Sequence, residues 1–244
     1  MRIPILMYHQ IDAPPPRGTP LRGLIVSPAS FAKQMGLLKF FGYQGLSMRD
    51  LEPYLRGEKQ GKVVGLTFDD GYQNNLSNAL PVLQKHGFTA TCYGVSGLLG
   101  GSNVWDADKV AAKPLMTASE WQQWHAAGMD VGSHTCSHAD LTELDAAAAR
   151  EEITRSKQAL EQSVGCEVRH FCYPYGRYRA EHALMVQDAG YATATTTHRG
   201  RVQRGDGLFE LRRIMVARAT HLLLFMAKIA TTYEDRHGAE VLKT

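Results

Sequence analysis

Two short polar runs contain residues whose types and spacing suit metal chemistry. Asp69 and Asp70 directly follow one apolar, strand-like stretch, and His134 and His138 follow another further along the chain. Two imidazoles and one carboxylate are a common ligand set for a divalent metal ion, which leaves the second carboxylate free for chemistry. Adjacent residues at a strand end point in opposite directions, so the two aspartates can play different parts. The combination predicts a metal site.

Each run has a simpler interpretation when it is taken alone. Asp70 precedes a glycine, and Asp-Gly is a common turn dipeptide. His134 and His138 are four residues apart, so they share one face if the chain enters a helical turn, and they could merely begin a polar helix. The occurrence of both runs at strand ends favours the metal site over these alternatives.

The elements that must position these residues are apolar runs separated by helical patterns. Capping signals mark several helices, such as Ser27 before a proline and Thr117 with Glu120 three residues later. This alternation predicts an α/β fold with a parallel sheet, and a closed barrel would collect the polar strand ends on one face. The runs are 3–8, 63–68, 88–95, 129–133, 168–173, 191–196 and 211–216.

Two loops are candidates for the substrate groove. Tyr173, Pro174 and Tyr175 form an aromatic turn after the run 168–173, which either closes a strand or forms a groove wall with a backbone N–H directed into the site. The proline-rich loop 13–18 lies in the first β–α connection, where barrel enzymes build substrate loops.

Composition excludes several classes of function. The chain of 244 residues has 27 basic and 24 acidic residues, a net charge of +3, which is too balanced to indicate nucleic-acid binding. No apolar run reaches the length of about 18 residues that a transmembrane helix requires. The N-terminal residues lack the apolar region of a signal peptide, which predicts a cytoplasmic protein; a periplasmic or extracellular location would require that a leader had been removed. The four cysteines lack metal-type spacing and are expected to be reduced.

The motifs resemble those of the polysaccharide deacetylases with a NodB-type domain, carbohydrate esterase family 4. Residues 67–71 are similar to its T-F-D-D-G motif, 133–138 to its [ST]-H-[ST]-x-x-H motif, and 173–176 to the P-Y-G part of its third motif. The resemblance implies a distorted (β/α)7 barrel that forms a single domain over residues 1–244. It also implies carbohydrate metabolism such as exopolysaccharide biosynthesis.

The sequence departs from the family pattern in three places. Cys172 stands where many members have an arginine, a fourth motif of the D-x-x-x-W type is not evident, and His221 is a poor match to the fifth motif, which supplies a catalytic acid. The first strand is similar to that of the poly-N-acetylglucosamine deacetylase branch, where a histidine near the N-terminus can act as the acid. His9 is therefore the candidate acid, with a passive pocket histidine as the alternative, and His221 at the start of an apolar helix is expected to be structural.

The resemblance implies hydrolysis of N-acetyl groups on a glycan. One divalent ion, with Zn as first candidate and Co, Ni, Fe or Mn also compatible, would be held by Asp70, His134 and His138.

The remaining residues receive roles in the same way. Asp69 would be the base, His9 the acid and the Tyr175 N–H an oxyanion donor, while Tyr8, Tyr173, Pro174 and Tyr175 would line the groove. Hydrolysis of small amides, formamides or O-acetyl esters is an alternative, as is a barrel that binds glycan without catalysis.

Overall fold

Parallel strands close into a barrel in the computed structural model, which describes residues 2–203 and 205–236. Hydrogen-bonded neighbours follow the order β1-β10-β9-β8-β7-β6-β5, and β5 pairs again with β1 to close the ring. The closed seven-stranded barrel confirms the predicted fold class, and each of the seven apolar runs supplies one strand. Its strands are β1 (Ile5–Tyr8), β5 (Val63–Phe68), β6 (Thr91–Gly94), β7 (Asp130–Ser133), β8 (His170–Cys172), β9 (Thr193–Arg199) and β10 (Leu211–Met215).

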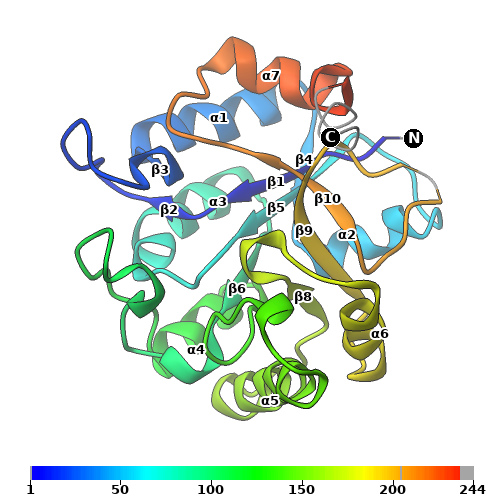
Figure 1. Ribbon diagram of the computed structural model, residues 1–244. Coiled ribbons are helices and arrows are strands. Elements are labelled where there is room, and N and C mark those ends of the chain that lie inside the picture. The colour runs from blue at the N-terminus through cyan, green and yellow to red at the C-terminus, as the bar shows by residue number, and fades with distance from the viewer. Residues whose placement is uncertain (1, 204, 237–244) are drawn as a thin grey trace.

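Helices surround the barrel (Figure 1). They are α1 (Pro28–Phe40), α2 (Met48–Leu55), α3 (Leu80–His86), α4 (Ala118–Ala126), α5 (Ala146–Val164), α6 (Ala180–Asp188) and α7 (Leu222–Ala230). The predicted caps are present: the Ser27 hydroxyl accepts from Ser30 N–H, and Thr117 and Glu120 form a reciprocal capping box. No described helix has both the length and the hydropathy needed to cross a bilayer.

Several short elements were not predicted from the sequence. The strand β4 (Gln44–Leu46) pairs with the beginning of β5, and β2 (Gln10–Ile11) pairs with β3 (Ile25–Val26) beside the barrel. The missed helices α2 and α3 are short, and Pro53 in the interior of α2 weakens its helical pattern. Short helical turns complete the described chain: η1 (Arg22–Leu24), η2 (Asn75–Ala79), η3 (Ser96–Leu98), η4 (Val104–Asp106), η5 (Leu141–Glu143) and η6 (Pro174–Gly176).

Barrel closure brings the carboxyl ends of the strands to one face. His9 follows β1, the two aspartates follow β5, and His134 follows β7. Backbone hydrogen bonds between neighbouring strands fix the relative positions of these ends. Asp69 N–H donates to the Tyr8 carbonyl at 2.9 Å, and His134 N–H donates to the Gly94 carbonyl at 2.9 Å. Groups that are far apart in the sequence therefore meet at the mouth of the barrel.

Candidate metal centre

Asp70, His134 and His138 converge at the mouth of the barrel. The Nε2 atoms of His134 and His138 lie 3.4 Å and 3.3 Å from the Asp70 Oδ1 atom, and all three side chains are buried. Ligands at about 2.1 Å from a tetrahedral zinc ion are about 3.4 Å apart, so these three atoms have the spacing that a divalent ion requires. The residues present therefore fit such an ion.

The backbone at these ligands is in an uncommon conformation. Asp70 has φ 74° and His138 has φ 63°, both in the left-handed region. Such conformations cost energy in residues other than glycine and are concentrated at functional sites. The chain therefore accepts local strain in order to direct these two side chains.

A hydrogen bond to the backbone of β8 fixes the ring of His134. Its Nδ1 atom lies 2.7 Å from the Cys172 carbonyl oxygen on β8. A carbonyl can only accept, so Nδ1 carries a proton and donates, which leaves Nε2, the nitrogen that faces Asp70, as the atom that can bind a metal ion. This is the tautomer that a metal ligand needs.

Aromatic rings rather than hydrogen bonds surround His138. The Trp105 ring stacks on it with centroids 4.2 Å apart and an interplanar angle of 10°, and the Tyr175 ring meets it edge-on at 4.7 Å. No sequence motif indicated Trp105; the only signal was a tryptophan next to the acidic Asp106 in a loop with no helical or strand pattern.

Arg213 was also missed, and it holds the other aspartate. Its guanidinium donates to both oxygens of Asp69, at 2.6 Å and 2.7 Å, and also to the Thr67 hydroxyl at 3.1 Å and the Thr196 carbonyl at 2.8 Å. Both partners of the pair are buried inside the barrel. Two adjacent arginines, Arg212 and Arg213, in the run 211–216 were the available signal, since a charge that faces the inside of a barrel needs a partner.

Arg213 also distinguishes between two possible sets of metal ligands. One ligand atom from each of Asp69, His134 and Cys172 also lies within 4.8 Å of the other two. The Arg213 guanidinium, however, lies 3.2 Å from the Cys172 sulfur and occupies both oxygens of Asp69. A cation placed there would face a buried positive charge, so the set that contains Asp70 is favoured.

The two carboxylates remain ionised for different reasons. Burial alone would raise the pKa of Asp69, but the Arg213 guanidinium outweighs burial and holds that pKa below its usual value. Burial likewise opposes ionisation of Asp70, but the imidazoles of His134 and His138 beside it outweigh burial and hold its pKa well below the usual range. An ionised Asp69 that does not ligate metal is suited to accept a proton.

The predicted groove wall requires correction. Tyr8 and Tyr173 are completely buried: the Tyr8 hydroxyl donates to Gln34 at 3.0 Å, and that of Tyr173 donates to the Phe209 carbonyl at 3.1 Å. Side chains alternate along a strand, so Tyr8 faces the helices while its neighbour faces the mouth of the barrel. Pro174 is buried as well, and only Tyr175, 45% exposed, is open to a ligand.

The two candidate acids occupy different places. His9 and Asp70 line one pocket of about 100 Å³, and His9 interacts electrostatically with both aspartates. His221 is exposed at the N-cap of α7, where its Nδ1 atom accepts from Leu224 N–H at 3.3 Å. Only His9 is thus placed at the candidate site.

Loops form the walls of this pocket. Pro15, Pro20 and Leu24 come from the first β–α connection and Val110 from the loop that carries Trp105. An ion pair at 3.0 Å between Lys113 and Asp12 joins these two loops. The proline-rich loop thus lies beside the site, as the sequence analysis proposed.

A closed parallel barrel with paired aspartates and paired histidines at the carboxyl ends of its strands has the arrangement expected of a barrel enzyme with its active site at that face. The family model for polysaccharide deacetylases matches residues 56–194, and the chain belongs to this family. The Bacillus subtilis (strain 168) protein YxkH is 31% identical over 218 residues, which cover 88% of this chain and 72% of that protein. A poly-beta-1,6-N-acetyl-D-glucosamine N-deacetylase of Staphylococcus aureus is 22% identical over 204 residues, 81% of this chain and 69% of that enzyme.

Solved structures of deacetylases have the same fold. The Streptococcus pyogenes deacetylase PplD, determined in complex with acetate, superposes with a TM-score of 0.82 at 28% identity, over 94% of this chain and 98% of that one. The polysaccharide deacetylase BC0361 from Bacillus cereus gives a TM-score of 0.78 at 32% identity, over 93% and 69% of the two chains. The resemblance noted in the sequence is confirmed at the level of family and fold.

Proposed function

We propose that this protein is a metal-dependent hydrolase that removes N-acetyl groups from a glycan, and that residues 1–244 serve it as one deacetylase domain. The observation that supports this most directly is the arrangement of Asp70, His134 and His138 beside an Asp69 that Arg213 holds ionised. A module that only bound metal or glycan would have no use for Asp69. The ends of the proposed domain, residues 1 and 237–244, lie outside the described residues.

Asp70, His134 and His138 would hold one divalent ion, with Zn as first candidate. Such an ion, when bound, polarises the acetyl carbonyl and lowers the pKa of water. Asp69 takes the proton of the attacking water with the lone pairs that Arg213 leaves free. The Tyr175 backbone N–H would donate to the oxyanion, a contribution of about 3 kcal/mol for one such donor in other enzymes.

The leaving amine must receive a proton before it departs. His9 is assigned this role because it lines the same pocket as Asp70 and no strand separates it from the aspartates. The proton that Asp69 removes and the proton that His9 supplies together balance the hydrolysis of the amide to a free amine and acetic acid.

The proposal is tested by acetate release from N-acetylglucosamine oligomers with β-1,4 and β-1,6 linkages, with Zn²⁺ or Co²⁺ added. O-acetylated xylan and a small acetamide serve as comparison substrates. Release from the oligomers by the wild-type chain, and none by Asp69→Asn, is the expected result. Turnover of the small acetamide or the O-acetyl ester alone would replace the glycan N-deacetylase with one of the alternatives. Retention of glycan binding with no turnover of any substrate would indicate a binding protein.

A further inference from the structure

The segment that joins the two histidine ligands is held from outside the barrel. On one side, Ser96 N–H donates to the Thr135 carbonyl at 3.1 Å and Gly97 N–H donates to the Cys136 carbonyl at 2.8 Å. A Cβ atom at Gly97 would lie 2.6 Å from the Cys136 oxygen, so η3 can approach this closely only with a glycine there. These contacts satisfy the carbonyl groups of the segment.

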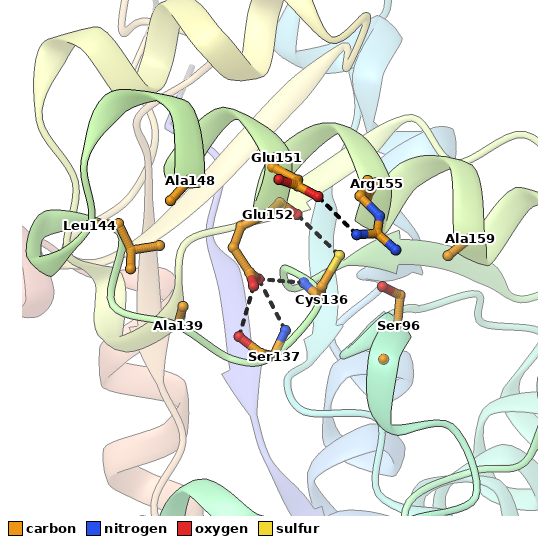
Figure 2. A pocket seen from close by; sticks show the side chains of 11 residues that line it. Ser96, Cys136, Ser137, Ala139, Leu144, Ala148, Glu151, Glu152, Arg155 and Ala159 are labelled. Atoms are coloured by element: carbon orange, nitrogen blue, oxygen red, sulfur yellow. Dashed lines mark hydrogen bonds and ion pairs between the residues drawn. The ribbon is translucent and has the colours of Figure 1, made fainter.

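Glu152 on α5 accepts hydrogen bonds from the N–H groups on the opposite side of this segment. Its Oε2 atom accepts from the N–H groups of both Cys136 and Ser137, at 2.8 Å and 3.0 Å, and its Oε1 atom accepts from the Ser137 hydroxyl at 2.8 Å (Figure 2). Two successive backbone N–H groups directed at one oxygen form an anion-binding arrangement. The Cys136 thiol adds a weak contact to the Glu152 carbonyl at 3.6 Å.

The adjacent acidic residue has a different partner. Glu151 pairs with Arg155 at 2.8 Å, one turn along the same helix, and both of these side chains are largely exposed (Figure 2). The two glutamates therefore share an element, a charge and a surface, but only Glu152 bonds to the loop through its carboxylate. This provides a matched control within the chain.

The loop needs this support because the conformation of its backbone is unfavourable. Thr135 and His138, at its two ends, have φ values of 66° and 63°. Among the residues described, His138 Nδ1 has no hydrogen-bond partner, whereas His134 Nδ1 is fixed by the Cys172 carbonyl. The position of the His138 ring thus depends on the path of the backbone and on the packing of aromatic rings around it.

We propose that Glu152 is a positioning residue for the metal centre. Its carboxylate holds the backbone of 136–137 so that His138 Nε2 stays within ligand distance of Asp70 and His134. Replacing a residue that hydrogen-bonds to a metal ligand typically changes metal affinity about 10- to 100-fold, and we expect an effect of this order for Glu152, which acts through the backbone between the two ligands. The inference rests on the metal assignment in the proposed function.

The test compares Glu152→Gln with Glu151→Gln. Glutamine preserves the size of the side chain but removes the negative charge that strengthens its bonds to the two backbone N–H groups, and the Ser137 hydroxyl must turn from donor to acceptor to meet the amide NH2. Affinity for Zn²⁺ is measured by competition with a chromogenic chelator, and the visible spectrum of the Co²⁺-loaded protein reports ligand geometry. We expect Glu152→Gln to bind Zn²⁺ roughly 10- to 100-fold more weakly with an altered Co²⁺ spectrum, and Glu151→Gln to match the wild type.

Ser137→Ala provides a second variant that removes only one of the three donors to Glu152. It should lower Zn²⁺ affinity less than Glu152→Gln does, so the proposal stays testable even if Glu152→Gln does not fold. Unchanged affinity and spectrum in both variants, with only a lower melting temperature of the metal-free protein, would show a purely structural role and overturn the proposal. A wild-type chain that binds no metal would instead overturn the metal assignment itself.

Discussion

Arg213 on β10 and Asp69 at the end of β5 form a bidentate ion pair inside the barrel, with N–O distances of 2.6 Å and 2.7 Å. The guanidinium also lies 3.2 Å from the sulfur of Cys172, the position where many family members have an arginine of their own. Because the Cys172 side chain is short, the side chain of Arg213 can extend from β10 into this space. Asp69, the proposed base, is therefore held by a residue that the third family motif does not contain.

Replacement of Arg213 should impair turnover more than metal binding. Arg213→Lys keeps the charge but loses the planar fork, and we expect kcat to fall by about 10-fold or more, with KM and metal content close to those of the wild type. Arg213→Met leaves Asp69 buried and unpaired, which should destabilise the fold by about 3–5 kcal/mol. Steady-state kinetics and urea unfolding measure the two effects. Full turnover in Arg213→Lys would show that the fork is dispensable.

The pH profile should reveal the same ion pair. Asp69 must be ionised to act as a base, and Arg213 holds the pKa of Asp69 below the usual carboxyl value. The midpoint of the acid limb in the pH profile of kcat should therefore lie below the usual carboxyl pKa in the wild type. In Arg213→Met, burial acts without the opposing cation, the pKa of Asp69 rises, and the limb should move to higher pH. The comparison is made where metal occupancy, measured in parallel, is complete. An acid limb that does not move would remove Asp69 from the role of base.

Replacing Asp69 and replacing Asp70 should have different effects on metal binding. Asp69→Asn should retain about one equivalent of metal but lose turnover, because the base is removed while the ligands remain. Asp70→Asn should lose both, since Asp70 lies within ligand distance of both histidines. Elemental analysis and acetate release give the two readouts, and the opposite pattern would exchange the assignments.

The histidine ligands should make metal binding dependent on pH. His134→Ala and His138→Ala should each lose most bound metal, and wild-type affinity should decrease as pH falls because a metal binds only the neutral imidazole. Zinc competition between about pH 5 and pH 8 measures this dependence. Undiminished binding in both variants would rule out this ligand set.

His9 and His221 should differ sharply on replacement. His9→Ala should lower kcat by about 10²- to 10⁴-fold with metal content unchanged, as expected for loss of a general acid. His221→Ala should leave kcat unchanged and lower stability by about 0.5–2 kcal/mol, because it removes the N-cap of α7. Near-normal turnover in His9→Ala would exclude it as the acid.

Local sequence determined the seven barrel strands, several of the helices and the two principal motifs. Apolar runs with short polar boundaries specify buried strands, and Ser27, Thr117 and Asp145 begin their helices because each side chain satisfies a free backbone N–H. Signals of this kind involve residues only a few positions apart. For the same reason, both polar runs could be placed at strand ends before any tertiary structure was known.

Only the closed barrel determined which distant side chains meet. Arg213 and Asp69 are 144 residues apart in sequence and become partners because β10 and β5 both flank β1. Tyr8 was assigned to the wrong face because an aromatic residue beside a strand end can point to either side until the pairing of strands and helices is fixed. Local sequence specifies elements through short-range hydrogen bonds and periodicity, whereas a site built across strands depends on long-range register that only tertiary packing decides.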